Sequence, residues 1–239
     1  VSTENSPVLV LAGLPRTGST ALQRLLCLHP DVDCLEFYQA IQPVETRGID
    51  PSSIGTSWDW RVLSAHCVTQ FLYYLRPLLS RMHVMGARMP CEETHITAHV
   101  FGSLLFEASL VNLTTYSNWY MTTDHTPAYE FCQLVFKIIA HQRGGTSHNR
   151  LRLLKSPQHT EQLDAILRVF PDAKVVMTHR PVVDIMKSMM PLIAYTGGTM
   201  SSEINLSLLG LFWLNRFQTM LRRYMNAREH VQVMDVHFN

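Results

Sequence analysis

Residues 13–20 read Gly-Leu-Pro-Arg-Thr-Gly-Ser-Thr, and this stretch decides the fold of the chain. It follows a short apolar run and precedes a helical pattern, so it predicts a strand, a loop and a helix. Gly13 and Gly18 have the spacing of the phosphate-binding loop of nucleoside-triphosphate enzymes, but the position of its lysine holds Ser19. The stretch therefore predicts a phosphate site that is poorly equipped for ATP.

The chemistry of this loop suits an anion. Two glycines allow the backbone to approach a phosphate, and the helix dipole favours negative charge at the first helical amides. An arginine side chain can add a pair of parallel hydrogen bonds. The alternative is an ordinary tight turn, which requires none of these polar residues. The candidate phosphate-binding residues are Arg16, Thr17, Gly18, Ser19 and Thr20.

Composition limits the kind of protein. The chain has 239 residues and is 46% hydrophobic, which favours one α/β domain over two smaller units. Its net charge is +1, so no global field attracts nucleic acid or an anionic membrane. Any anion site must be local.

The cysteines and the apolar segments predict a cytoplasmic protein. Five widely spaced cysteines without a Cys-x-x-Cys pair are typical of a reduced compartment. The polar start has no signal-peptide pattern, and the apolar stretch 206–214 is too short to span a membrane. We expect no integral membrane segment.

The order of elements predicts the architecture. Apolar runs at 8–12, 151–155, 174–178 and 231–238 predict strands, and helical periodicity covers 20–28, 126–144, 158–169, 181–190 and 206–227. Strands that alternate with helices indicate a parallel sheet covered on both faces. We expect one domain over residues 1–239 with a mainly helical insertion at about 58–142, irregular segments at 43–56 and 195–202, and a further C-terminal portion absent from this chain.

Two more polar groups follow predicted strands. Arg180 comes after the strand at 174–178, with Ser188 along the next helix, and together they could hold a second phosphate. Lys155 and His159 come after the strand at 151–155, where a lysine could neutralise a leaving oxygen and a histidine could act as a base. The plainer alternatives are a surface ion pair for Arg180 and a helix cap for the second group.

In this order, the three motifs resemble the sulfotransferases that use 3'-phosphoadenosine 5'-phosphosulfate (PAPS). Residues 15–20 look like the 5'-phosphosulfate loop of that family, and Arg180 and Ser188 match its 3'-phosphate-binding pair. Lys155 falls where the cytosolic branch has its Lys-Thr-His or Lys-Ser-His motif, and the stretch from there to Arg180 is close to a bacterial branch. The resemblance implies a P-loop-like three-layer α/β sandwich.

The resemblance also implies a reaction. A sulfuryl group would pass from PAPS to a hydroxyl or amine, without a metal, while a side-chain base removes the acceptor proton. The histidine of the cytosolic branch falls at Pro157 here, so another base is required. His159 and Glu36 are equal candidates, and Glu92 or Glu93 is a third choice.

Several alternatives stay open at this point. A P-loop kinase of a small metabolite would use the same loop, and a nucleotide-binding module without a base would keep only the phosphate site. The acceptor could be a small molecule, a lipid or a carbohydrate, and the oligomeric state is open. His95 and His99 lie four residues apart, where a polar wall of the acceptor pocket is favoured over a metal site.

Overall fold

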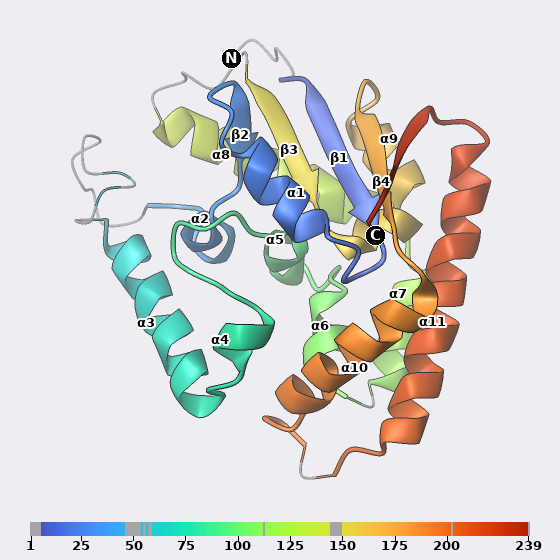
Figure 1. Cartoon of the computed structure of the whole chain (residues 1–239). Coiled ribbons are helices and arrows are strands. Elements are labelled where there is room, and N and C mark those ends of the chain that lie inside the picture. Colours follow the sequence, from blue (N-terminus) through green and yellow to red (C-terminus); the bar gives the residue numbers. More distant parts are fainter. Residues whose placement is uncertain are drawn as a thin grey trace.

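The computed structural model describes residues 6–45, 54, 56, 59–111, 113–143, 150–201 and 203–238. Most of the irregular segment expected at 43–56 lies outside these residues. The described part of the chain is built around one sheet, drawn in Figure 1.

Five parallel strands form the sheet in the order β2-β3-β1-β4-β5. Their bounds are Val8–Gly13 for β1, Val32–Cys34 for β2, Leu151–Lys155 for β3, Lys174–His179 for β4 and Val233–His237 for β5. Leu11 pairs with both Lys155 and Val176, so β1, β3 and β4 end side by side. The predicted parallel sheet flanked by helices is confirmed, and its central strand carries the glycine loop.

Helices occupy the connections between the strands. They are α1 (Ser19–Leu26), α2 (Phe37–Ile41), α3 (Trp60–Leu75), α4 (Leu79–Met82), α5 (Thr94–Ala98), α6 (Leu105–Ser109), α7 (Thr114–Thr122), α8 (Thr126–Gln142), α9 (Leu163–Val169), α10 (Val182–Gly197) and α11 (Leu206–Arg228). A 3-10 helix, η2 (Pro157–Glu161), precedes α9. The segment between β2 and β3 is thus helical wherever it has regular structure among the described residues.

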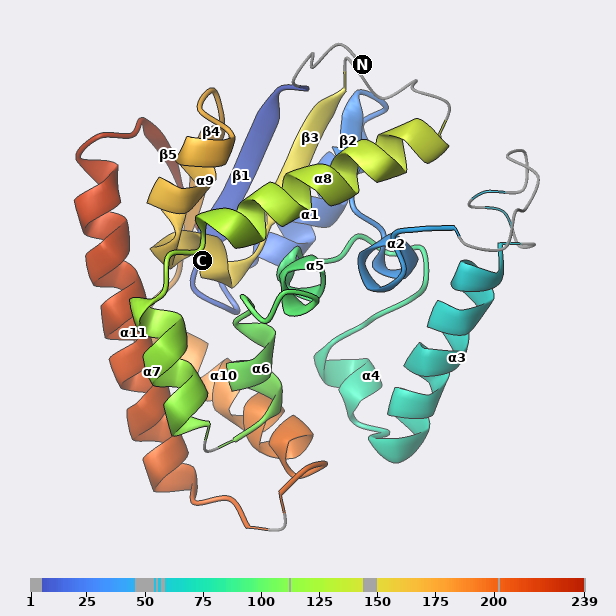
Figure 2. The ribbon, with the colours of Figure 1, turned by 180° about the vertical axis from the view of Figure 1, so that it is seen from behind.

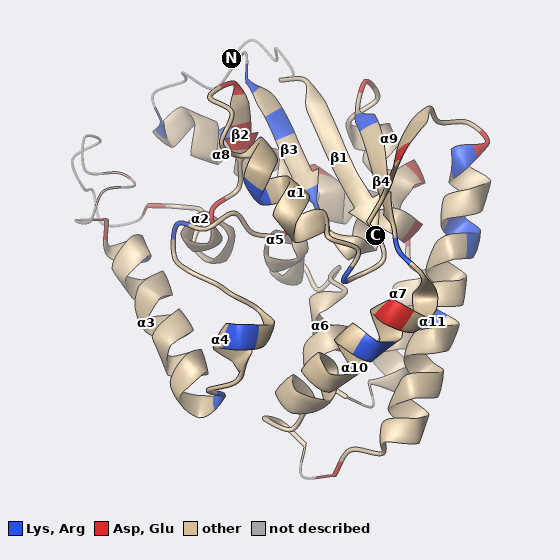
Figure 3. Cartoon of the chain, in the orientation of Figure 1, with Lys and Arg blue, Asp and Glu red and all other residues tan. Residues whose placement is uncertain are grey.

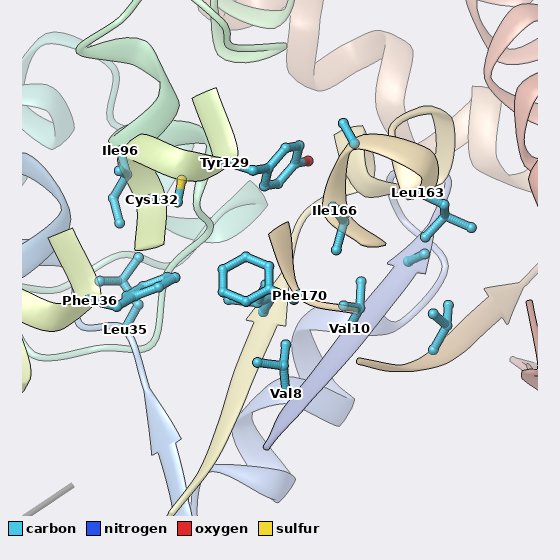
Figure 4. Close-up of a cluster of buried hydrophobic side chains, with 14 of the residues drawn as sticks. Val8, Val10, Leu35, Ile96, Tyr129, Cys132, Phe136, Leu163, Ile166 and Phe170 are labelled. Atoms are coloured by element: carbon cyan, nitrogen blue, oxygen red, sulfur yellow. The ribbon is translucent and has the colours of Figure 1, made fainter. Parts of the chain in front are cut away.

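Alternation along β1 creates the three layers. Val8, Val10 and Ala12 pack into a core with α8 and α9, part of which Figure 4 shows. Leu9 and Leu11 belong to a second cluster on the opposite face, with side chains of α1. Figures 1 and 2 show α1 and α8 on opposite faces of the sheet.

A group of helices lies beyond the carboxyl edge of the sheet. Side chains of α10 and α11 form a separate apolar cluster around the fully buried Trp213. Arg216, also buried, joins α11 to Glu161 of η2 at 2.7 Å and to Glu107 of α6 at 2.9 Å. Burial lowers the pKa of this guanidinium, but the two carboxylates outweigh that effect and raise it. This network fixes α6 against the strand ends.

The structure bears on the expectations about the cysteines and about membrane-spanning helices. Cys27 and Cys34 form a disulfide with a Cα–Cα distance of 5.9 Å, whereas the cysteine pattern was expected to be typical of a reduced compartment. The disulfide joins the end of α1 to β2. The spacing of the two cysteines in the sequence could not indicate that they pair. Among the described residues no helix is both long enough and apolar enough to cross a membrane.

Candidate functional site

Gly13 places the start of the loop against β4. Its φ is +141°, and a Cβ atom there would lie 2.2 Å from the Oγ1 atom of Thr178. The Gly13 amide donates to Thr160 Oγ1 at 2.9 Å, and Thr17 Oγ1 donates to the Leu14 carbonyl at 2.8 Å. Thr17 is buried behind the loop at 2.7 Å from Thr178. These contacts hold the loop in one shape.

Gly18 caps helix α1 in a left-handed conformation. Its φ is +80°, and a Cβ atom would lie 2.4 Å from the ring of Phe238. Arg16 also has a positive φ of 66°, which strains any residue with a Cβ and is often found at functional loops. The first amides of α1 have no partner inside the helix and lie at the positive end of its dipole. The loop is therefore built to receive an anion.

Two guanidinium groups lie at this loop. Arg16 Nε donates to Ser188 Oγ at 2.9 Å, and a terminal nitrogen of Arg180 donates to the Arg16 carbonyl at 3.0 Å. Within the described part of the chain, no carboxylate lies within 4.0 Å of either group. Burial and the charge of Arg180 lower the pKa of Arg16. The positive charge here lacks a protein counter-ion.

Lys155 brings a third cation from the end of β3. The side chain is only 3% exposed, and its Nζ donates to Thr20 Oγ1 at 3.0 Å. The same nitrogen forms an ion pair with Glu92. Burial raises the pKa of Glu92, but Lys155 outweighs burial, so that pKa is lowered. Glu92 is therefore ionised at neutral pH.

One cleft of about 670 Å³ collects most of the predicted residues. Its lining residues come from the carboxyl edge of the sheet and from helices that include α4 and α10, which Figure 1 places below that edge. Its lining includes Arg16, Gly18, Ser19, Thr20, Lys155, Arg180 and Ser188. Thr17 does not line it, since it is buried behind the loop.

His159 lies outside the lining of the cleft. The residue is fully buried, with Nε2 3.0 Å from Glu93 Oε2 and Nδ1 2.8 Å from the Tyr129 hydroxyl. The same Glu93 oxygen accepts a hydrogen bond of 2.8 Å from the backbone amide of Lys155. His159 and Glu93 are thus buried contacts that hold the end of β3 in place, and neither lines the cleft.

Glu36 also lies outside the lining. It caps α2 in a reciprocal capping box with Gln39. Burial raises its pKa, more than Arg143 and Arg88 lower it. Neither of the two leading base candidates from the sequence therefore borders the cleft, whereas the third choice, Glu92, does.

Two histidines border the cleft as well. Burial lowers the pKa of His83, and burial lowers the pKa of His95 to about 4. His83 follows α4 in a stretch without any recognisable motif, so the sequence analysis missed it. His95 packs edge-on against Phe37, while His99 Nε2 lies 3.0 Å from the Ala40 carbonyl. The described residues contain no group of three or more His, Cys, Asp or Glu side chains arranged to hold a metal.

Comparison with known proteins identifies relatives of this architecture. A family model described as the sulfotransferase family matches residues 7–239. The crystal structure of the sulfotransferase STF1 from Mycobacterium tuberculosis H37Rv has a TM-score of 0.81 at 28% identity, covering 98% of this chain and 62% of that one. The crystal structure of the sulfotransferase STF9 from Mycobacterium avium has a TM-score of 0.78 at 22% identity, and the match covers 99% of this chain and 59% of that one. No curated protein sequence matches the chain.

The chain spans about three fifths of the length of these two relatives. Both have the same α/β fold as this chain, so the expected fold class is confirmed. The family match runs from β1 through β5 and includes every element that lines the cleft. The chain therefore belongs to the sulfotransferase family.

Proposed function

We propose that this protein transfers a sulfuryl group from PAPS to a hydroxyl group of an acceptor. The observation that carries the proposal is the pair Arg16 and Arg180, which face one cleft beside the glycine loop without a carboxylate partner among the described residues. A ligand with two separate anionic groups would neutralise both. PAPS has a 5'-phosphosulfate and a 3'-phosphate, and fits this charge pattern.

Each cation has a proposed role in holding the donor. Arg16, Thr20 and the first amides of α1 would bind the 5'-phosphosulfate. Arg180 and Ser188, which both line the cleft, would bind the 3'-phosphate. Ser188 would then exchange its hydrogen bond from Arg16 for one to the phosphate. Lys155 would turn from Glu92 to the oxygen that bridges phosphorus and sulfur.

The proposed step is an in-line displacement at sulfur. The acceptor oxygen forms a bond to sulfur while the bond from sulfur to the bridging oxygen breaks. The electron pair of the broken bond stays on that oxygen, where the charge of Lys155 stabilises it. The acceptor proton passes to the carboxylate of Glu92, which lines the cleft as Glu36 and His159 do not.

Glu92 and Lys155 would act as a pair. Lys155 keeps the carboxylate ionised before the donor binds, because it lowers the pKa of Glu92. When Lys155 turns to the donor, this stabilisation weakens and Glu92 becomes a stronger base. A P-loop kinase would use the loop differently, with a lysine at the position of Ser19 and a divalent cation on the phosphates.

A thermal-shift titration tests the donor site. We expect 3'-phosphoadenosine 5'-phosphate to stabilise the protein more strongly than ADP, because ligands that bind only the native state raise its stability. Arg180→Ala should remove this preference. Arg168→Ala, a change at an exposed arginine of α9, is the matched control and should keep it.

Turnover tests the reaction itself. Sulfated product should form from PAPS in the presence of a chelator, and ATP with magnesium should give no phosphorylated product. A titration without preference for the 3'-phosphorylated nucleotide, or turnover with ATP alone, would overturn the proposal.

A further inference from the structure

The half of the cleft away from the glycine loop has a different chemistry. Its walls come from α3, α4, α6, α10 and α11. Figure 3 shows the charged residues of α10 only in the part of that helix nearer the sheet, and the far part of α10 carries none. Apolar side chains dominate the lining there: Leu72, Leu79, Leu105, Met189, Ile193 and Trp213. The cleft thus joins a cationic end to an apolar end.

Some polar groups in the apolar half already bond within the protein. Thr196 Oγ1 donates to the Leu192 carbonyl of its own helix at 2.9 Å. Arg76 Nε donates to Thr199 Oγ1 at 2.8 Å, and its guanidinium carbon lies 5.2 Å from the centre of the Tyr195 ring. Each buried hydroxyl of a ligand that found no partner here would weaken binding by about 5- to 150-fold. A sugar carries several such hydroxyls and suits this half poorly.

The apolar half reaches the surface where α10 ends. Met200 lines the cleft and is 73% exposed. Nearby, the amide of Leu78 donates to the Tyr195 hydroxyl at 3.2 Å, which joins α4 to α10 beside this opening, and Leu78 itself is 50% exposed. A mainly apolar path therefore runs from the strand ends to an opening at Met200, where Arg76 and Thr199 also line the cleft.

From these observations we infer that the acceptor is an alcohol attached to an extended hydrocarbon group. Its hydroxyl meets Glu92, and its hydrocarbon fills the apolar half between α3, α6 and α10. The inference rests on the proposed function, since it names the acceptor class of the same site. Of the lipid, carbohydrate and other small-molecule acceptors, it selects the lipid-like class.

Binding of straight-chain alcohols tests the inference without requiring turnover. The protein is first saturated with 3'-phosphoadenosine 5'-phosphate, and the Kd of 1-alkanols from hexanol to dodecanol is then measured. Transfer of each methylene from water to an apolar site strengthens binding by up to about fourfold. Affinity should rise with chain length on this scale, while glucose and a tyrosine-containing peptide should bind more weakly than any of the long alcohols.

Two leucines of α3 provide a matched pair of variants. Leu72 lines the cleft, while Leu63 lies outside the lining and is 61% exposed. Leu72→Asn should weaken dodecanol binding by about tenfold, as expected for lost apolar contact. Leu63→Asn should leave it unchanged. Both variants should bind the nucleotide as the parent protein does, which shows that they are folded.

Tryptophan fluorescence tests whether the hydrocarbon of the alcohol lies inside the cleft. Trp213 is buried directly behind the apolar lining, close enough for 11-bromo-1-undecanol in the cleft to quench its emission, and Trp213→Phe should lose most of that quenching. Nucleotide binding with no dependence on alcohol length, or with glucose or the peptide bound more tightly, overturns this inference and leaves the proposed function standing. A protein that does not bind the nucleotide overturns the proposed function instead.

Discussion

Glu92 and Lys155 meet where the cleft reaches the end of β3. They are 63 positions apart in the sequence and form an ion pair. Lys155 also contacts Thr20 of the glycine loop, and Glu92 also lines the cleft. The ion pair therefore links donor binding to the proposed base.

Glu92→Gln tests that role at the residue scale. A general base contributes about 10²- to 10⁴-fold, so kcat should fall by that factor. The nucleotide 3'-phosphoadenosine 5'-phosphate should bind at least as tightly as to the parent protein, because Lys155 no longer has to leave a carboxylate. Because the pKa of Glu92 is lowered below its usual 4.5, kcat/KM of the parent enzyme should not decline through this residue between pH 7 and 5. Steady-state kinetics over that range is the measurement.

Glu36→Gln is the control for this variant. Glu36 is outside the cleft lining, and glutamine keeps its shape at the start of α2. A fall in kcat for Glu36→Gln with full activity for Glu92→Gln would reverse the assignment.

His95 makes stability depend on pH. Its pKa is lowered from 6.5 to about 4 by burial. Between these values the unfolded chain binds a proton at this residue and the folded protein does not. The stabilisation is therefore complete above pH 6.5 and is lost as pH falls toward 4, by about 1 to 3 kcal/mol.

Urea unfolding at pH 7.5 and pH 5 measures this effect. The free energy of unfolding should fall less between the two values in His95→Gln than in the parent protein. His66→Gln, at an exposed histidine of α3, should behave like the parent. An identical pH dependence in His95→Gln and the parent would show that His95 is not responsible.

At the scale of elements, the turn from β1 into α1 depends on glycine and the middle of α11 does not. Gly18 has φ +80° and no room for a Cβ atom, whereas Gly210 lies inside α11 with nothing within 4 Å of such an atom. Gly18→Ala should therefore destabilise the protein by at least about 1 to 2 kcal/mol and abolish nucleotide binding. Gly210→Ala should stabilise it by about 0.5 to 1 kcal/mol.

Both glycine variants can be followed by urea unfolding. The two changes in the free energy of unfolding should have opposite signs. The substitution is the same at both positions, so the difference reports the backbone conformation of each glycine. Equal effects at the two positions would mean that conformation is not what requires Gly18.

Elements with strong local signals were predictable, and the exceptions have physical causes. Leu151–Lys155 forms the predicted strand, because a run of apolar residues between turns suffices for a buried strand. β2 was missed because its three residues, Val32–Cys34, are too few for a periodic signal. The helix predicted at 181–190 continues through Pro191 to Gly197, since the burial of Ile193 in the core around Trp213 outweighs the break that proline favours.

At the scale of the whole molecule, ligand binding should couple to global stability. The chain has a net charge of +1, so we expect the proposed nucleotide binding to depend on the local cluster of Arg16, Arg180 and Lys155. At 100 times its Kd, 3'-phosphoadenosine 5'-phosphate should raise the free energy of unfolding by about 2.7 kcal/mol. Raising the salt concentration should reduce this gain at fixed ligand concentration, because ions screen the cluster.

Unfolding in urea at low and high salt, with and without ligand, measures both effects. Arg16→Ala should lose most of the gain, and Arg168→Ala on the surface of α9 should keep it. A gain that does not change with salt would argue against a binding site dominated by charge.

The sequence by itself determined which candidate phosphate-binding residues lie together in this protein. The residues of the glycine loop are contiguous, and Lys155, Arg180 and Ser188 each follow a recognisable strand, so local patterns place them at one edge of a parallel sheet. Only the tertiary structure decided that Glu92 faces the cleft while His159 and Glu36 do not, and that the far half of the cleft is apolar. The reason is that burial and contact between distant residues depend on how the helices between β2 and β3 pack, and spacing along the chain carries no record of that packing.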